Sequence, residues 1–479
     1  MHGPPTTPQT HDVVVIGGGA SGAFLAVQLL RRSPNLSLAV VEKQGLPGRG
    51  FAYGTSWPCH LLNVPAGVMS ALPDEPTHFL DWVRSNHKPS TDAGRFLPRE
   101  LYGRYVGSLL EDAAAASPGC FHWIADEVVA LRREPRRMVV SPKTGPELTA
   151  RAVVLASGNL PTRLEISGLN TAPSGKSRRR YVPSGWANAA FENLASTESM
   201  LLIGTGLTSV DVAAALRSQG FSGHIHMLSR HGLLPRRYQQ TAAPWPPFWN
   251  DASPRTIRGL LRLIRAEVRR ASASGADWRA VIDSLRPHTQ QIWQSLPVDE
   301  KKRFLRHARI YWDVHRHRLA PQIDATLREL SRNGLLTIHA GHLLGYREIP
   351  RYAEVSFRNR ATQATETLRV HRVVNCTGPE TDYRRADSPL LCSLFEQGLA
   401  RPDALALGLD VDARGALLDA EGKPSHSLFC IGPARKGSLW ETTAVREIRA
   451  QAAELAEELL RQLQRPAPQS PVRAPATSR

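Results

Sequence analysis

The first residues with a chemical signature form a glycine-rich loop, Gly17-x-Gly19-x-x-Gly22, which follows the apolar run 13–16. The first glycine permits a tight turn, the second lets the backbone approach a pyrophosphate, and the third allows close packing of helix on strand. Free N–H groups at the start of a helix favour an anion there. Glu42 ends the next apolar run, where a carboxylate accepts hydrogen bonds from ribose hydroxyls. The pattern predicts a dinucleotide-binding unit, with a chance glycine turn as the alternative.

A second glycine-rich loop repeats this pattern further along the chain. Gly204 and Gly206 follow another apolar run at a constant offset of 187 residues from Gly17 and Gly19, and Ser209 takes the place of the third glycine. Serine is small enough for similar packing. One such loop is a weak signal, whereas two loops with the same strand–loop–helix order are far more specific. The sequence therefore predicts two dinucleotide-binding units.

The two loops differ at the residue that ends the following strand. Ser229 occupies the position that matches Glu42, and Arg230 follows it. A carboxylate would repel a 2′-phosphate there, whereas serine and arginine bind it. We therefore predict that the second unit uses NADPH rather than NADH. Arg236 and Arg237 either extend this anion site or are solvated surface arginines.

Three further apolar runs end in small residues and a glycine, at Gly158, Gly378 and Gly432. In flavoproteins with two dinucleotide domains, such strands return the chain past the two cofactors. The helix after the third run then points its N-terminus at the flavin, where negative charge develops on reduction. Each run alone is a weak signal, because many buried strands end in glycine. Their order after the two loops is what supports the interpretation.

Predicted strands and helices alternate along most of the chain, which indicates α/β layers with parallel sheets. The stretch 254–332 differs, because its apolar residues have helical spacing and it carries 17 Lys and Arg against 8 Asp and Glu. We interpret it as a mainly helical insertion in the second unit. Beyond it we predict strands at 335–340, 353–359 and 367–376, and a final helix at 443–463.

The length of 479 residues predicts two or three domains. The apolar runs are far shorter than the roughly 20 residues that span a bilayer, and residues 1–10 match no signal or transit peptide. We therefore expect a cytoplasmic protein without a membrane partner. The five cysteines include no CxxC pair, which argues against a disulfide framework, a zinc ribbon or a redox pair.

The chain resembles a known flavoprotein family over about residues 11–465. The family is the FAD/NAD(P)-binding group that includes a bacterial FAD-dependent urate hydroxylase and flavin N-monooxygenases acting on amino acids such as aspartate. The motifs that carry the resemblance are GGGASG at 17–22, VVEK at 40–43, FAYG at 51–54, HLLNVPA at 60–66, DVHRHR at 313–318, NCTGP at 375–379 and LWETTAV at 439–445.

The resemblance implies two Rossmann-like domains, one for FAD and one for NADPH, with a mainly helical insertion. The implied division is a disordered tail at 1–11, the first part of the FAD domain at 12–198, the NADPH domain at 199–370 with its insertion at about 254–332, the second part of the FAD domain at 371–465, and a disordered tail at 466–479.

The motifs and the resemblance together assign a set of cofactor-binding residues. The segment 62–64 would pass the isoalloxazine and the turn 440–443 would close over it, while 313–318 would line the substrate side or pack domains together. His315 and His317 lack a third ligand nearby, so we expect no metal site. The cofactor-binding residues are Gly17, Gly19, Ala20, Ser21, Gly22, Glu42, Lys43, Leu62, Asn63, Val64, Gly158, Gly204, Gly206, Ser209, Arg230, Gly378, Gly432, Trp440 and Thr442.

The resemblance implies a monooxygenase that takes hydride from NADPH, reacts with O2 through a flavin C4a-hydroperoxide, and hydroxylates a small polar substrate such as urate or an amino acid. Asn63 is the candidate catalytic residue, with a turn or capping asparagine as the alternative. The second hypothesis is an NADPH-dependent reductase or oxidase that passes electrons to a quinone, a metal or O2. The sequence does not indicate the oligomeric state.

The net charge of +17 raises a third hypothesis, a flavoprotein associated with nucleic acid. Few aromatic residues lie among the arginines of the helical insertion, and no nucleic-acid-binding motif is present. We therefore favour an arginine-rich composition over a nucleic-acid partner.

Overall fold

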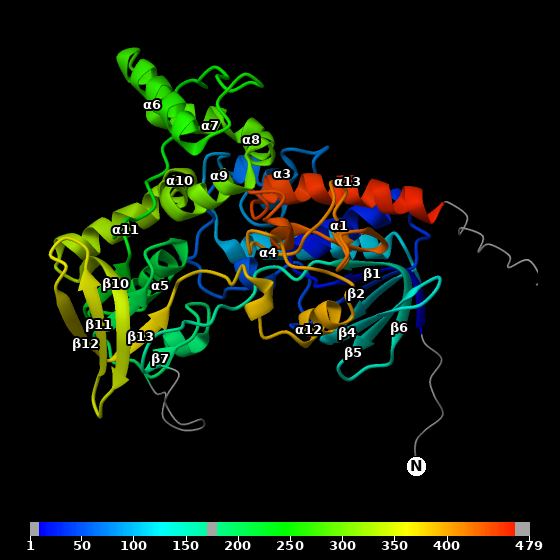
Figure 1. The fold of residues 1–479 in the computed structure, drawn as a ribbon, viewed down its shortest axis with the longest axis horizontal. Helices are drawn as coiled ribbons and strands as arrows, with labels where there is room; N and C mark the ends of the chain where they lie inside the picture. Colours follow the sequence, from blue (N-terminus) through cyan, green and yellow to red (C-terminus); the bar gives the residue numbers. More distant parts are fainter. Residues whose placement is uncertain (1–8, 170–179, 465–479) are drawn as a thin grey trace, which may run out of the picture.

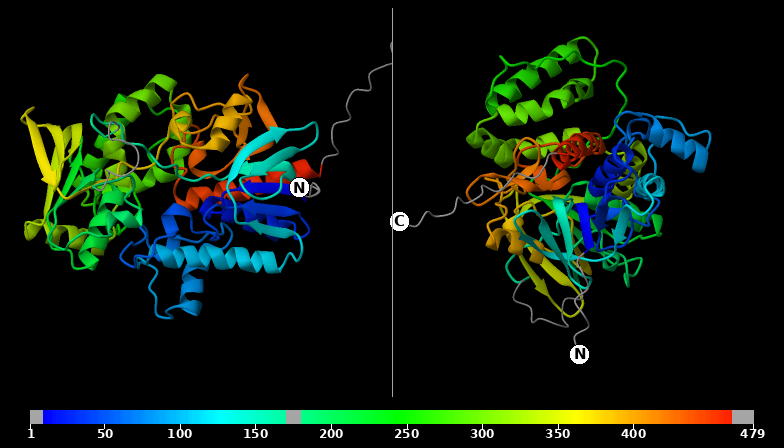
Figure 2. Two further views of the ribbon diagram at one scale, coloured as in Figure 1. Left: turned by 90° about the horizontal axis from the view of Figure 1, so that it is seen from below. Right: turned by 90° about the vertical axis from the view of Figure 1, so that its right-hand side faces the viewer.

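The computed structural model describes residues 9–169 and 180–464, which form two β-sheets lying side by side along the long axis (Figure 1). Helices of residues 257–295 project from one side, as Figure 2 also shows. The predicted fold class, α/β with two Rossmann-like units and a mainly helical insertion, is confirmed. The predicted tails 1–11 and 466–479 lie outside the described residues, except that residues 9–11 begin the first strand by pairing with 148–150.

The first sheet is built around the strand that leads into the first glycine loop. This strand, β1, lies between β2 and β6 and runs parallel to both. Strand β5 pairs antiparallel with β6 and with β4. The strands run in the order β14 (Ala416–Leu418), β15 (Pro424–Cys430), β6 (Leu148–Leu155), β1 (Gln9–Ile16), β2 (Leu38–Val41) and β3 (Phe121–Ile124), with β5 (Met138–Pro142) attached to β6 and β4 (Val128–Arg133) attached to β5.

Both faces of the first sheet are covered, which explains why the second half of β1, residues 13–16, is continuously apolar. Val13 and Val15 pack against helices on one face, while Val14 and Ile16 pack into a second cluster on the other. The helices of the first face are α1 (Ala20–Arg32), α3 (His78–Asn86), α4 (Arg99–Ala115) and α13 (Val445–Leu463), and α12 (Pro389–Glu396) covers the second.

The second sheet repeats this arrangement around β8, which lies between β9 and β13 and is parallel to both. Helices α5 (Leu207–Ser218) and α11 (Pro321–Arg332) pack on one face. The strands run in the order β12 (Thr365–Val370), β11 (Ala353–Asn359), β10 (Leu336–Glu348), β9 (Ile225–Ser229), β8 (Met200–Ile203), β13 (Arg372–Asn375) and β7 (Tyr181–Val182).

The predicted strand 367–376 is divided at His371 into two strands with different partners. Strand β12 pairs with β11, whereas β13 pairs with β8. Strands β7 and β13 therefore lie in the second sheet, although the predicted division places residues 181–182 and 372–375 with the FAD domain. The exact domain boundaries stay a prediction.

The insertion is a series of short helices that packs on the C-terminal part of the chain. A π-helical turn at Phe304–Ala308 joins two of them. The helices are α6 (Ile257–Ala273), α7 (Trp278–Ser284), α8 (Thr289–Ser295), α9 (Val298–Arg303) and α10 (Arg309–Arg316). Elsewhere α2 (Gly50–Tyr53) and single turns at Ala66–Val68, Asn188–Ala190, Arg286–His288, Tyr383–Arg385 and Gly432–Arg435 complete the described structure. Within the described residues, no helix is long and apolar enough to cross a membrane.

Candidate functional site

The first glycine loop is packed so closely that side chains are excluded from it. Gly17 has φ +104°, and a Cβ there would lie 2.3 Å from the carbonyl oxygen of Ala156. A Cβ on Gly22 would lie 1.9 Å from the carbonyl oxygen of Gly17. Gly19 caps α1 in an extended conformation without a side-chain cap, so the first-turn N–H groups keep their hydrogen-bonding capacity. The residues present therefore fit a pyrophosphate at the start of α1.

Glu42 stands beside this loop at the end of β2, almost completely buried. Its carboxylate accepts hydrogen bonds from the backbone N–H groups of Gly18 at 2.7 Å and Gln44 at 2.8 Å. The ring of Trp123 packs on Gly18, and its buried indole Nε1 has no hydrogen-bond partner among the described residues. A fixed carboxylate and an indole donor at one edge suit the ribose and base of a dinucleotide. Sequence reasoning missed Trp123, because only the pairing of β2 with β3 brings it there.

The C-terminal part of the chain closes on the same loop. A Cβ on Gly432, which has φ +77°, would lie 2.4 Å from Oγ of Ser21. Thr442 Oγ1 donates to the carbonyl oxygen of Gly432 at 2.8 Å. Gln451 of α13 accepts from the Gly432 N–H at 3.2 Å and donates to Thr442 Oγ1 at 2.9 Å. The structure thus brings together the predicted residues Ser21, Gly432 and Thr442, and it adds Gln451, which carried no sequence signal.

The chain after β2 covers the loop from the other side. Gly48 donates its backbone N–H to the carbonyl oxygen of Gly18 at 2.8 Å, and Gly50 approaches Gly19 closely. Leu62 is buried and its N–H donates to the carbonyl oxygen of Leu97 at 2.8 Å. Asn63 and Val64 beside it are half-buried. The role of Asn63 as a catalytic residue stays a prediction.

Three more of the predicted cofactor-binding residues differ in their exposure and packing, and their role stays a prediction. Lys43 points outward and forms an ion pair with Glu127 at 3.7 Å. Gly158 faces open space with φ +64°. Trp440 packs against the helical insertion, where its ring centroid lies 4.9 Å from that of Trp293. Trp440 therefore joins the turn 440–443 to the insertion.

The second glycine loop follows the same construction with one substitution. A Cβ on Gly204 would lie 2.5 Å from the carbonyl oxygen of Cys376, at the end of β13. Gly206 caps α5 and faces open space. Gly378, with φ +93°, also faces open space. Ser209 takes the third glycine position and donates its hydroxyl to the carbonyl oxygen of Gly204 at 2.7 Å. The open helix start fits a second pyrophosphate.

Cations gather beside the second loop, at the end of β9. Arg230 is exposed, and Arg360 donates to its carbonyl oxygen at 3.5 Å. Burial lowers the pKa of His231, and the neighbouring charges of Arg360 and Arg230 lower it further. Arg360 belongs to the turn between β11 and β12, so sequence spacing gave no indication of it. The two arginines form a candidate site for a 2′-phosphate.

A buried polar cluster joins the segment beside the first loop to the helix after the second. Arg99 forms an ion pair with Asp211 of α5 at 2.9 Å, and both side chains are at most 12% exposed. His60 Nε2 lies 3.1 Å from the carbonyl oxygen of Asp211. Burial raises the pKa of Asp211 to about 6 although Arg99 opposes it, and burial with the charge of Arg99 lowers the pKa of His60 to about 4. The cluster fixes the two units relative to each other.

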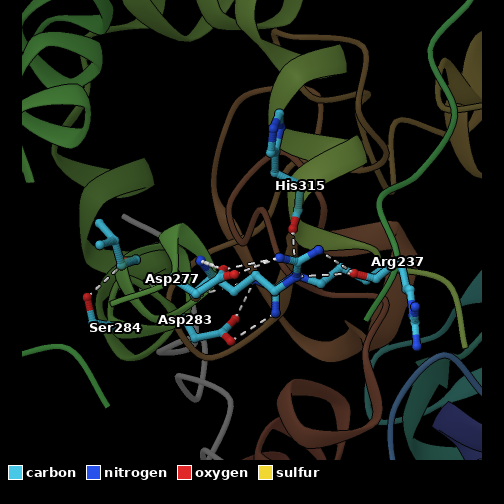
Figure 3. Close-up of polar contacts among 8 residues, drawn as sticks. Arg237, Asp277, Asp283, Ser284 and His315 are labelled. Carbon is cyan, nitrogen blue, oxygen red and sulfur yellow. Dashed lines mark hydrogen bonds and ion pairs between the residues drawn. The ribbon is translucent and has the colours of Figure 1, made fainter. Parts of the chain in front are cut away.

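The motif at 313–318 holds the insertion in place. Arg318 forms two hydrogen bonds of 2.9 Å with the carboxylate of Asp283. Figure 3 shows Asp283 and His315 in the polar network of the insertion. Arg318 also donates to the carbonyl oxygen of His315 at 2.9 Å. Arg279 donates to the carbonyl oxygen of Arg237 at 3.0 and 3.2 Å, which fixes the loop that follows β9. These contacts make Arg318 a packing residue.

Beside this network the insertion encloses a cavity of about 890 Å³. Its walls come from α6, α7, α8, the π-helical turn and α10, and from Trp440, Arg328 of α11 and residues in the segment 236–249. Arg236 and Arg237 line this cavity, in addition to a smaller one beside α11.

Comparison with known proteins agrees with this geometry. Residues 14–160 match the model of an FAD-NAD(P)-binding family. No curated protein matches the chain in sequence. Among solved structures, the chain is similar to an ornithine N-hydroxylase from Kutzneria sp. 744 (TM-score 0.63, 15% identity, covering 95% of this chain and 99% of that chain).

Two further solved structures share the arrangement. One is an L-lysine 6-monooxygenase from Pseudomonas syringae (TM-score 0.65, 16% identity, 94% of this chain and 99% of that chain). The other is a cadaverine monooxygenase from Erwinia amylovora (TM-score 0.63, 14% identity, 96% of this chain and 95% of that chain). The resemblance stated from the sequence is thereby confirmed at the level of the fold: the chain carries an FAD-NAD(P)-binding segment within the fold of flavin-dependent N-monooxygenases.

Proposed function

We propose that the protein is an FAD- and NADPH-dependent monooxygenase that hydroxylates an organic substrate. The observation that carries the proposal is the pair of glycine-rich cradles, in each of which the first glycine, Gly17 or Gly204, lies against the carbonyl oxygen that ends a neighbouring strand. The first cradle has a carboxylate at its edge and the second has arginines. Full-length similarity to three hydroxylating enzymes supports the same reaction class.

The chain's own residues divide the work between binding and positioning. The α1 N-terminus holds the FAD pyrophosphate, and Glu42 accepts hydrogen bonds from the ribose hydroxyls. Arg230 and Arg360 hold the 2′-phosphate of NADPH through charge-assisted hydrogen bonds. Bound FAD supplies the electron transfer and the activation of O2.

Buried groups next to the first cradle keep the site rigid. Thr442 and Gln451 fix the Gly432 turn through hydrogen bonds of 2.8 to 3.2 Å. The N-terminus of α13 then faces the same region, where its dipole favours negative charge. The segment 48–54 lies against the loop through Gly48 and Gly50, and Asn63 is half-buried in the adjoining segment. Amino-acid-like compounds and urate are the candidates that the resemblance offers as substrates.

The reaction balances as substrate, O2, NADPH and a proton giving hydroxylated substrate, NADP+ and water. The first test reduces the flavin of the holoenzyme anaerobically with NADPH and then mixes it with O2 while its absorbance is followed. A transient spectrum that differs from both reduced and oxidised flavin supports a monooxygenase. Single-step reoxidation with one H2O2 per NADPH, with or without candidate substrates, would replace the proposal with a reductase or oxidase.

A further inference from the structure

The cavity between the helical insertion and Trp440 has the size and the lining of a ligand site. Its volume of about 890 Å³ falls in the range of small-molecule pockets, roughly 300–1,000 Å³. Trp440, which forms part of the cavity wall, belongs to the same turn as Thr442. Thr442 in turn donates a hydrogen bond to the carbonyl oxygen of Gly432. The cavity therefore borders the region assigned to the flavin.

The lining is predominantly aromatic and aliphatic. Trp293 and Trp312 donate their indole N–H groups to the carbonyl oxygen of Gly437 at 2.8 Å and to the carboxylate of Glu441 at 3.0 Å. Their indole N–H groups are thus satisfied within the protein. Trp293 is buried against Trp440, so the ring surfaces that a ligand can reach are those of the half-buried tryptophans. The tryptophans in the lining are Trp249, Trp278, Trp293, Trp312 and Trp440.

Two large apolar side chains in the cavity wall remain open to solvent. Leu261 is 36% exposed and Tyr311 is 47% exposed. Apolar side chains that line a concave surface gain free energy when an apolar ligand covers them, by about 25 cal/mol per Å². The wall thus favours a ligand with a large apolar body.

The charges in the cavity wall are all positive. None of the described residues that line it is Asp or Glu. Arg279 is neutralised by Asp277 at 2.9 Å and Arg328 by Asp324 at 2.7 Å. Arg237 also lines the cavity, and Figure 3 shows its side chain pointing away from Asp277 and Asp283.

Three of the lining arginines, Arg236, Arg237 and Arg265, form no ion pair within the described ranges 9–169 and 180–464. An ammonium group would find no counter-ion in this wall, whereas a carboxylate would find several exposed guanidinium groups. The charge pattern therefore favours an anion over a cation.

A backbone irregularity lies in the same wall. The turn Phe304–Ala308 is π-helical within an otherwise α-helical run, and Phe304, His307 and Ala308 line the cavity. Isolated π-helical turns are rare and occur frequently at functional sites. This second observation points to the same place as the lining.

We propose that this cavity is the substrate pocket of the monooxygenase and that it takes an organic carboxylate with an apolar body of about ten or more carbon atoms. The inference rests on the proposed function and departs from the small polar substrate expected from the sequence. Urate and diamines lack the apolar body, and diamines carry the charge that the wall repels.

Binding is tested by calorimetric titration of the holoenzyme without turnover. The three probes are dodecanoate, dodecyltrimethylammonium and butyrate, each below its critical micelle concentration where it has one. Dodecanoate should bind at least tenfold more tightly than dodecyltrimethylammonium, because the tails match and the headgroups carry opposite charge. It should bind at least a hundredfold more tightly than butyrate, because each buried methylene contributes. Equal affinity for the two twelve-carbon probes would overturn the charge assignment, and equal affinity for butyrate would overturn the apolar pocket.

Two substitutions of Leu261, an exposed residue of the cavity wall, test whether the probes bind in this cavity. Leu261→Glu should weaken dodecanoate binding at least tenfold and strengthen binding of dodecyltrimethylammonium, while Leu261→Gln should weaken both probes equally and only slightly. Arg262→Ala, on the same helix but outside the lining, is the matched control and should change neither. Unchanged dodecanoate affinity in Leu261→Glu would locate the binding elsewhere and overturn the proposal.

A spectral titration separates this inference from the proposed function. Dodecanoate should perturb the absorption spectrum of the bound flavin with the same saturation as in calorimetry, because Trp440 connects the cavity to the flavin region. Binding without any flavin perturbation would overturn the substrate role. If instead the flavin is perturbed but reoxidises in one step to peroxide with every carboxylate tested, the proposed monooxygenase function fails while the pocket stands.

Discussion

The two glycine loops have one backbone plan and opposite chemistry at their edges. In both loops the first glycine approaches the carbonyl oxygen that ends a neighbouring strand, at Ala156 in one and Cys376 in the other. The first loop has a buried carboxylate, Glu42, hydrogen-bonded to its own backbone. The second has an exposed Arg230 beside Arg360. The backbone plan therefore fits a pyrophosphate in both units, and we expect the residue after the next strand to decide which nucleotide binds.

The third position of each loop separates the units further. Gly22 contacts the backbone of Gly17 with no room for a side chain, whereas Ser209 fits and uses its hydroxyl to hold Gly204 at 2.7 Å. The first loop is the tighter of the two, and the segment 48–54 covers it, while Gly206 of the second loop faces open space. This difference suits a cofactor that stays bound in the first unit and one that exchanges in the second.

The largest expected effect comes from adding a methyl group to each loop. Gly22→Ala should abolish flavin binding or folding, because its Cβ would lie 1.9 Å from a backbone oxygen. Gly206→Ala should fold with a full flavin content, because a Cβ there has no neighbour within 4 Å. Flavin absorbance per protein after purification measures both. Equal flavin content in the two variants would contradict the difference in packing.

The contact between the two units gives the next largest effect, and it depends on pH. Arg99→Ala leaves the buried Asp211 without its counter-ion, which costs about 3 kcal/mol when that carboxylate is charged. The pKa of Asp211 is already raised to about 6 by burial, and loss of Arg99 raises it further. Because the pKa of Asp211 is higher in the folded protein than in the unfolded chain, the free energy of unfolding is highest at low pH and falls as the pH rises through the folded-state pKa.

We therefore expect the melting temperature of Arg99→Ala to fall much further below wild type at pH 8 than at pH 5. Adding Asp211→Asn to this variant removes the charge, so the double variant should recover stability at pH 8 and lose the pH dependence. A melting-temperature difference that is the same at both pH values would show that Asp211 is not the group responsible.

Nucleotide preference gives a smaller effect that tests the cationic edge. Arg230→Ala and Arg360→Ala should each raise the KM for NADPH by about tenfold, since a hydrogen bond to a charged group contributes roughly 1.5–3 kcal/mol. The KM for NADH should stay unchanged, because NADH lacks the 2′-phosphate. Arg351→Ala, at the other end of the β10–β11 hairpin, is the control. Equal effects on both nucleotides would refute a 2′-phosphate site.

The two arginines also show what the sequence could and could not reveal. Arg230 was predictable, because it follows a strand at a fixed distance from its glycine loop. Arg360, Trp123 and Gln451 were not, because each reaches its loop only through strand pairing or helix packing over long sequence distances. Glycine loops are local patterns, so their roles follow from spacing alone.

The cavity in the insertion was even less predictable. Helical spacing indicated the helices of 254–332, but the direction in which their tryptophans face depends on contacts with Gly437 and Glu441 more than a hundred residues away. The division of the predicted strand 367–376 at His371 could not be predicted for a similar reason. The sequence of a strand does not indicate which neighbouring strand it will pair with.

The smallest expected effect concerns Asn63, beside the first loop. Its half-buried amide contributes about one neutral hydrogen bond, roughly 1 kcal/mol, so Asn63→Ala should lower the ratio of hydroxylated product to NADPH consumed by about fivefold. Flavin content should not change, because the backbone contact of Leu62 with Leu97 remains. Asn86→Ala, in an exposed part of α3, is the control. Product and H2O2 are measured against NADPH consumed; a ratio equal to wild type would leave Asn63 with a turn role only, whereas a loss of flavin would place the residue in the framework of the first cradle.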